Sequence, residues 1–130
     1  MKKQKFQFEY IFNTTPQSIF SFISTPNGLS QWFADSVNEL ISDPKSYEIW
    51  WGKTPSKIIE IASKSNKYIR FCWEEDKDSN YYFELSIHHD ELTMVNSLII
   101  TDFTEEDDFE DLKSFWDSNI KRLKCRIGSK

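Results

Sequence analysis

The sequence has 130 residues, which is enough for one domain with a single hydrophobic core and too few for two. Aromatic residues make up 16% of the chain, and its formal net charge of −5 argues against binding to the phosphate backbone of nucleic acids. No apolar run approaches the roughly 20 residues of a transmembrane helix, and the N-terminus lacks the apolar stretch of a secretion signal, so we expect a cytoplasmic protein with no membrane span.

The first predicted element is a strand over residues 5–12. Its aromatic residues recur at a spacing of two, which is typical of a strand with one buried face. Two short helices are predicted next, because Thr15 precedes Pro16 and Thr25 precedes Pro26. Threonine is a favourable N-cap residue, and proline is well suited to the first helical position.

Six further strands are predicted from residue 35 onward. Their ranges are 35–42, 46–52, 56–63, 67–75, 80–88 and 91–103, with turn-forming residues such as Ser42, Asp43 and Pro44 between them. Such short links require antiparallel neighbours, because a parallel crossover takes about a dozen residues or more. The three apolar residues 98–100 interrupt the alternation in the last strand, so its two faces stay unassigned there and a bulge is an open alternative.

A long helix is predicted at the C-terminal end of the chain. Thr104 is its expected N-cap, the acidic residues 105–108 and the basic residues within 121–126 complement the helix dipole, and Gly128 is its expected stop. Apolar residues recur at spacings of three and four, so one broad face must be buried against the sheet. The predicted fold is therefore α+β, in the order β-α-α-β-β-β-β-β-β-α, with a seven-stranded antiparallel sheet around the helix in one domain over residues 1–130.

Two segments resemble a known family. Residues 15–34 contain a Pro-led helix, a second Pro and the pair Trp32 and Phe33, and this segment resembles the opening motif of the heat-shock protein 90 ATPase activator homologue family. Residues 115–124 are similar to that family's closing helix. Over essentially the whole chain, the order of elements resembles the helix-grip fold of the START-like (SRPBCC, birch-pollen-allergen-like) superfamily. That superfamily includes carriers and enzymes, so the resemblance implies a fold and selects no activity.

The residues that most often carry chemistry form no recognisable site. Adjacent strand residues point to opposite faces, so His88 and His89 cannot bind one metal together. The three glycines form no phosphate-binding loop or dinucleotide motif. Cys72 and Cys125 lack the spacing of a metal site or a redox pair, and we expect both to be buried. The sequence therefore predicts no cofactor, no metal and no catalytic residue.

The surplus of aromatic residues indicates a cleft between the helix and the sheet, although the same rings are also suited to filling a core. Asn119 is polar beside the apolar stripe of the helix, so it is expected either to bond the polar end of a ligand or to reach water. The candidate lining residues, taken from their expected faces, are Phe8, Tyr10, Trp32, Trp50, Phe71, Trp73, Phe83, Leu85, Trp116 and Asn119.

Three functions remain open at this point. The leading hypothesis is that the chain binds a small apolar or amphipathic ligand under its C-terminal helix. The second is a protein-interaction module, such as a heat-shock protein 90 ATPase regulator or a homodimer, that uses a strand edge or a surface aromatic such as Trp51 or Tyr82. The third is an enzyme of cyclase or hydrolase type, although no residue pattern in the sequence indicates one.

Overall fold

One antiparallel sheet of seven strands and one long helix form the framework of the protein. The computed structural model describes residues 2–41 and 45–128. Over these residues the predicted fold class and the predicted order of the strands and α-helices are confirmed. The elements are β1 (Gln4–Phe12), α1 (Pro16–Ile23), α2 (Pro26–Leu29), β2 (Ser36–Leu40), β3 (Ser46–Trp51), β4 (Thr54–Lys64), β5 (Tyr68–Trp73), η1 (Glu74–Asp76), β6 (Phe83–His89), β7 (Asn96–Thr104), η2 (Glu106–Asp108) and α3 (Phe109–Ile127).

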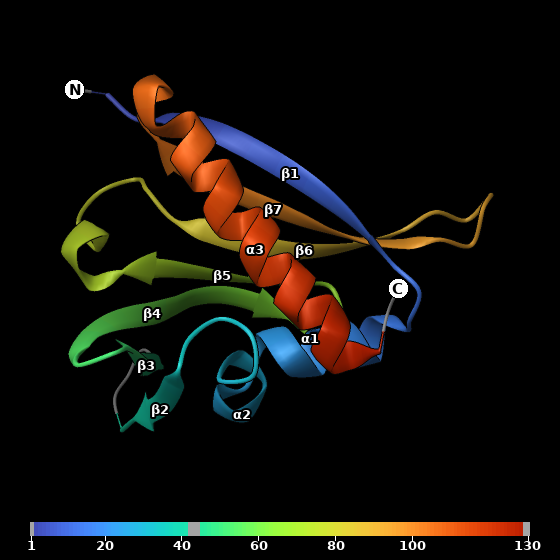
Figure 1. The fold of residues 1–130 in the computed structure, drawn as a ribbon, viewed down its shortest axis with the longest axis horizontal. Coiled ribbons are helices and arrows are strands. Elements are labelled where there is room, and N and C mark those ends of the chain that lie inside the picture. Colours follow the sequence, from blue (N-terminus) through green and yellow to red (C-terminus); the bar gives the residue numbers. More distant parts are fainter. Residues whose placement is uncertain (1, 42–44, 129–130) are drawn as a thin grey trace.

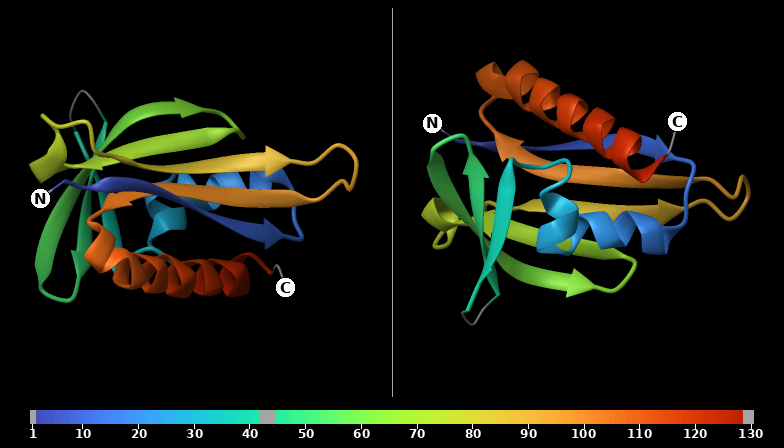
Figure 2. Two further views of the ribbon diagram at one scale, coloured as in Figure 1. Left: turned by 90° about the horizontal axis from the view of Figure 1, so that it is seen from above. Right: turned by 60° about the horizontal axis from the view of Figure 1, so that its bottom comes forward.

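The spatial order of the strands is β1-β7-β6-β5-β4-β3-β2, so the first strand of the chain pairs with the last. Helix α3 crosses one face of this sheet diagonally (Figure 1). Figure 2 shows α3 along one side of the sheet, and it shows the β6–β7 hairpin extending beyond the rest of the fold. Helix α1 packs against β6 and α3, and α2 packs against β2.

Several strand ends differ from the predicted ones for local reasons. β5 stops at Trp73 because the next three residues form the 3₁₀-helix η1. β7 begins at Asn96, because residues 90–95 form a turn in which Met94 donates its backbone N–H to the carbonyl of Asp90. The register of β7 is continuous, and the bulge lies instead in β4 between Glu60 and Ala62. The predicted turn at 42–44 lies outside the described residues.

The long helix ends as predicted and begins later than predicted. Gly128 has a φ of +82° and donates its backbone N–H to the carbonyl of Lys124, which is a left-handed C-terminal cap. The prediction that Thr104 caps the helix was wrong, because Thr104 is the last residue of β7 and the N-cap of α3 is Asp108, the last residue of η2. The acidic residues nevertheless precede the positive end of the helix dipole.

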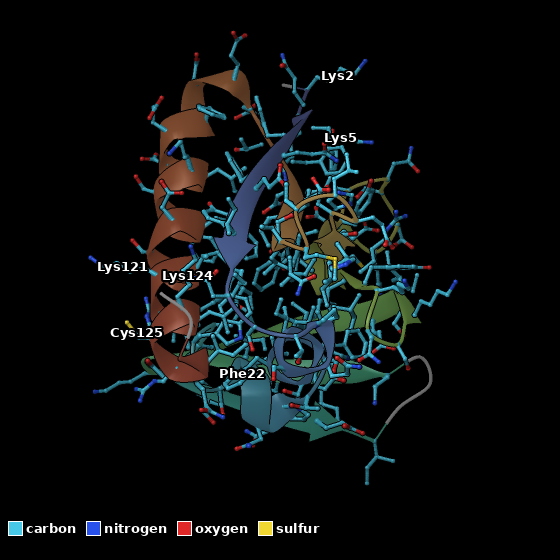
Figure 3. The ribbon with its side chains drawn as sticks, turned by 90° about the vertical axis from the view of Figure 1, so that its right-hand side faces the viewer. Lys2, Lys5, Phe22, Lys121, Lys124 and Cys125 are labelled. Carbon is cyan, nitrogen blue, oxygen red and sulfur yellow. The ribbon has the colours of Figure 1, made fainter. Side chains whose placement is uncertain are left out.

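The two cysteines differ in their environment. Cys72 is buried in β5, as predicted, and burial raises the pKa of its thiol. The prediction that Cys125 is buried was wrong, because this residue is exposed. Figure 3 shows Cys125 on the side of α3 that faces away from the sheet, close to Lys121. Its neighbours in sequence, Leu123 and Ile127, belong to the apolar stripe, and Cys125 lies between them on the opposite face of the helix.

A close approach of α1 and α2 depends on Gly28. A Cβ atom added at this position would lie 2.6 Å from the Cα atom of Phe22 and would also collide with the carbonyl oxygen of Ser21. Both are backbone groups that cannot rotate away, so we expect Gly28→Ala to lower the free energy of unfolding by about 1–3 kcal/mol. Urea unfolding measures this change. Asn27→Ala, at an exposed position of the same helix, is the control, and an equal loss for both variants would contradict the steric explanation.

Candidate functional site

The centre of the space between α3 and the sheet is filled by side chains. The ring of Phe33 lies at the centre of these side chains, and the centroids of six other aromatic rings are 5.5–6.4 Å from its own centroid. Six of the candidate lining residues have at most 4% of their surface exposed and belong to this packed interior or its edge: Trp32, Phe71, Phe83, Leu85, Trp116 and Asn119. A ligand could reach these side chains only by displacing others.

Two candidates from β1, Phe8 and Tyr10, face α3 and are partly buried. The ring of Phe8 lies 5.9 Å from that of Phe109. The hydroxyl of Tyr10 donates a 2.7 Å hydrogen bond to Asp117, and burial, together with this bond, raises the pKa of Tyr10. Asp117 also accepts a 2.8 Å bond from the ammonium of Lys113. These contacts fasten the edge strand β1 to the helix.

The prediction that Trp50 faces the space between the sheet and α3 was wrong. The buried residues Tyr47 and Ile49 point toward the core, so alternation along β3 places Trp50 on the other face of the sheet. Its indole N–H donates a 2.7 Å hydrogen bond to Glu48, which lies on that same face. The neighbouring Trp51 points inward instead, and its indole donates to the carbonyl of Phe33.

Asn119 is buried rather than at the wet edge of the helix. Only 4% of its surface is exposed, and its amide nitrogen has no hydrogen-bond partner among the described residues. An unpaired buried amide costs free energy, about 1–3 kcal/mol in proteins. Of the two outcomes expected from the sequence, exposure to water is therefore excluded. Asn119 lines neither the hollow at the N-terminal half of α3 nor the one near the β6–β7 hairpin.

A hollow of about 240 Å³ opens beside the packed centre, at the N-terminal half of α3. The elements around it are the start of β1, the segment from β5 to β6, the end of β7 and α3, which meet at the upper left of Figure 1. Trp73 is the one candidate lining residue that borders it. The full lining is Lys3, Trp73, Asp76, Tyr81, Tyr82, Asp102, Phe103, Leu112 and Phe115.

One wall of this hollow is formed by a partly buried carboxylate, Asp102, that the sequence reasoning missed. Asp102 follows the buried Leu98 and Ile100 on the core face of β7. One of its oxygens accepts a 3.0 Å hydrogen bond from the indole of Trp116, and the other accepts a 2.7 Å bond from the backbone N–H of Phe103. Within the described part of the chain, no cation forms an ion pair with Asp102.

The protonation of Asp102 responds to this environment. Burial raises the pKa of its carboxyl from 3.8 to about 6, because a charged carboxylate is less stable away from water. The hydrogen bonds from Trp116 and Phe103 and the charge of Lys3 oppose this rise in pKa, whereas Asp76 adds to it. A carboxyl group with a strongly raised pKa in an aromatic hollow is a frequent mark of a functional site.

Two tyrosines of the hollow already hold cations of the protein itself. The ammonium of Lys3 lies 4.9 Å from the ring centroid of Tyr81 and 3.9 Å from the carboxylate of Asp76. The guanidinium of Arg70 lies 4.0 Å from the centroid of Tyr82. These rings therefore present electron-rich faces at positions where positive charge is stable.

A second, more open hollow of about 550 Å³ lies near the β6–β7 hairpin and includes Lys67, His88 and His89. Nδ1 of His89 is 2.7 Å from the side-chain oxygen of Asn96, so this ring is engaged within the hairpin. Across residues 2–41 and 45–128, no three His, Cys, Asp or Glu side chains gather as a metal site would require. Nor does any helix in those ranges have the length and apolar character to cross a membrane.

Comparison with known proteins identifies the family. A model of the START-like superfamily domain matches residues 1–129. The chain belongs to the START-like superfamily. The resemblance stated from the sequence is thus confirmed at the level of the superfamily. A solution structure of the Bacteroides fragilis protein BfR322 is 39% identical over 97% of this chain and 92% of that chain, with a TM-score of 0.67. No curated protein matches the chain.

More distant START-like structures share only the fold. The dimeric Aha1 of Colwellia psychrerythraea is 13% identical, covers 93% of each chain and has a TM-score of 0.75. A Staphylococcus aureus protein of unknown function is 10% identical over 98% of this chain and 94% of its own, with a TM-score of 0.78. At these identities, neither likeness carries an activity over to this START-like chain.

Proposed function

We propose that this START-like domain binds a small apolar or amphipathic molecule in the hollow at the N-terminal half of α3. The observation that carries the proposal is the contrast between two neighbouring regions. The centre beneath α3 is packed with rings around Phe33, whereas the hollow beside it is open and bordered by aromatic side chains and by the partly buried carboxylates of Asp76 and Asp102. A mostly apolar pocket with a few converging polar groups is the usual form of a small-molecule site.

The size and exposure of the hollow limit the ligand. Its volume of about 240 Å³ is below the range of roughly 300–1,000 Å³ that is common for drug-sized ligands. A molecule with one ring or a short chain fits this space best. Phe115 on its wall is 37% exposed, and a bound ligand would remove part of this apolar surface from water, which is worth about 25 cal/mol per Å².

The binding test depends on closing the hollow without changing the rest of α3. We expect single-ring amphipathic compounds to bind the wild-type protein in isothermal titration calorimetry and to raise its melting temperature. Leu112→Phe, which places a larger ring in the hollow, should reduce the affinity about tenfold or more. Ser114→Phe introduces the same ring on the exposed face of the same helix and should leave the affinity unchanged.

Two results would contradict this location. One is the absence of binding and thermal stabilisation across a library of lipids and small aromatic compounds. The other is equal affinity for the Leu112→Phe and Ser114→Phe proteins. Mass spectrometry of the ligand after incubation distinguishes binding from the enzymatic alternative, because an enzyme would change the compound and a binding domain returns it unaltered.

The protein-interaction alternative has less support from its two candidate aromatics. Trp51 is hydrogen-bonded to the backbone of Phe33, and its ring packs 5.8 Å from that of Trp73. The centroid of the Tyr82 ring lies 4.0 Å from the guanidinium of Arg70 and 5.0 Å from the ring centroid of Phe103. Both aromatics therefore already contribute to the fold of the chain itself, although 36% of the surface of Trp51 is exposed.

A further inference from the structure

We propose that the hollow is selective for organic cations, and that a protonated amine on a small ring or chain binds there with its ammonium group against Asp102. This inference rests on the proposed function and adds the charge of the ligand to it. Three observations support it: the unused acceptor positions of Asp102, the absence of an ion-pair partner for Asp102 among the described residues, and the aromatic walls.

Asp102 has room for further donors. A carboxylate can accept about four hydrogen bonds, and the described residues supply two, from the indole of Trp116 and the backbone N–H of Phe103. Both donors are neutral. A partly buried carboxylate that has no ion-pair partner among the described residues is destabilised by the loss of water, and an arriving ammonium would provide a cation in direct contact together with up to three donors.

The walls favour the same kind of ligand. Aromatic faces attract cations most strongly where water is excluded. Trp73, Tyr81, Tyr82, Phe103 and Phe115 all border the hollow, and two of these rings already hold the side-chain cations of Lys3 and Arg70. An aromatic enclosure with a carboxylate in its wall is complementary to an ammonium group on an apolar body.

Lys3 is the one residue of the lining that argues for the opposite charge. Its ammonium could bind an anionic ligand, yet it already lies 3.9 Å from the carboxylate of Asp76 and 4.9 Å from the centre of the Tyr81 ring. With Asp102 ionised, the lining carries two carboxylates and one ammonium, a net charge of −1 from Asp76, Asp102 and Lys3. Lys3 therefore acts as a built-in cation with which an amine ligand would compete.

Three probes of matched shape test the inference by calorimetry on the full chain at about pH 8. They are 2-phenylethylamine, 2-phenylethanol and phenylacetate, which offer a cation, a neutral hydroxyl and an anion on the same ring. We expect the amine to bind about tenfold or more tightly than the alcohol, and phenylacetate to bind more weakly than both. Asp102→Asn should abolish the preference for the amine while keeping the affinity for the alcohol.

The controls separate Asp102 from the general charge of the protein. Glu75→Gln removes one carboxylate from the exposed part of η1, next to Asp76 in sequence, and should leave the affinity for the amine unchanged. Lys3→Gln removes the competing cation and should increase that affinity severalfold. Both substitutions lie at exposed or partly exposed positions, so the variants are expected to fold.

The outcomes distinguish this inference from the proposed function. Equal affinities for the amine and the alcohol, or tighter binding of phenylacetate that is lost in Lys3→Gln, would overturn the charge selection and keep the hollow as a binding site. An amine preference that persists in Asp102→Asn would also overturn it. If none of the three probes binds and a wider library also fails, both proposals are wrong.

Discussion

Replacing Phe33 by alanine is expected to lower the free energy of unfolding by about 3–5 kcal/mol. Phe33 is 1% exposed and contacts aromatic rings from the preceding residue, β3, β5, β6 and α3. Removing its ring would leave a cavity that stiff neighbouring rings cannot fill, so the loss of contacts adds to the loss of buried surface. Urea or guanidinium unfolding, followed by tryptophan fluorescence, measures the change.

The matched control for this prediction is Phe115→Ala. Phe115 lies 6.2 Å from Phe33 and belongs to the same cluster, but 37% of its surface is exposed. The smaller amount of surface that it buries predicts a loss clearly below that of Phe33→Ala. If the two variants lost equal stability, or if Phe33→Ala lost less than about 1 kcal/mol, the aromatic rings beneath α3 would not be tightly packed around Phe33.

Asp102→Asn is expected to change how stability depends on pH. Burial raises the pKa of Asp102 from 3.8 to about 6, so between these values the folded protein holds this proton more tightly than the unfolded chain does. The contribution of Asp102 to the free energy of unfolding is therefore greatest below about pH 4 and is lost as the pH rises through about 6, by about 3 kcal/mol in total. Asparagine does not titrate and lacks this dependence.

The measured quantity is the difference in unfolding free energy between Asp102→Asn and the wild type, from about pH 4 to about pH 8. We expect it to shift by about 2 kcal/mol in favour of the variant over this range, since the other carboxylates contribute equally to both proteins. The nearby charges of Lys3 and Asp76 oppose each other in their effect on this pKa. A difference that is constant with pH would contradict the raised pKa of the partly buried Asp102.

The fold could be predicted from the sequence because its signals are local and repeated. Thr15 and Thr25 each accept a hydrogen bond from the backbone N–H three residues later, as the Thr-Pro pairs indicate. The spacing of the apolar residues in α3 indicates the face that it buries. The superfamily resemblance followed from these elements in order, and the match over residues 1–129 agrees with it.

The candidate site was harder to predict, because it depends on which face a residue occupies and on how tightly its neighbours pack. Trp50 and Trp51 are adjacent aromatics, so the alternation of the strand does not tell which of the two faces the core. A sequence also cannot show whether rings fill a space or surround it, and most of the candidate rings fill it. The hollow is formed by residues from the ends of elements, whose neighbours are set by the tertiary structure.

Asp102 left a signal in the sequence that was obscured by one feature. Leu98, Ile100 and Asp102 share the core face of β7, so a charged residue continues the series of core-facing positions. The apolar Ile99 between them blurred the alternation. Extending the period from the buried Leu98 and Ile100 by one step would have marked Asp102 as a carboxylate on the core-facing side of the strand, which is an unusual and informative observation.

The location of a bound ligand tests the proposed site most directly. The indole N–H resonances of the five tryptophans report this location when ¹⁵N-labelled protein is titrated with 2-phenylethylamine. A ligand in the hollow is expected to shift the resonances of Trp73, which borders the hollow, and of Trp116, which donates to Asp102, with Trp32 and Trp50 unchanged. Shifts at Trp32 without shifts at Trp73 and Trp116 would place the ligand elsewhere and contradict the proposed binding site.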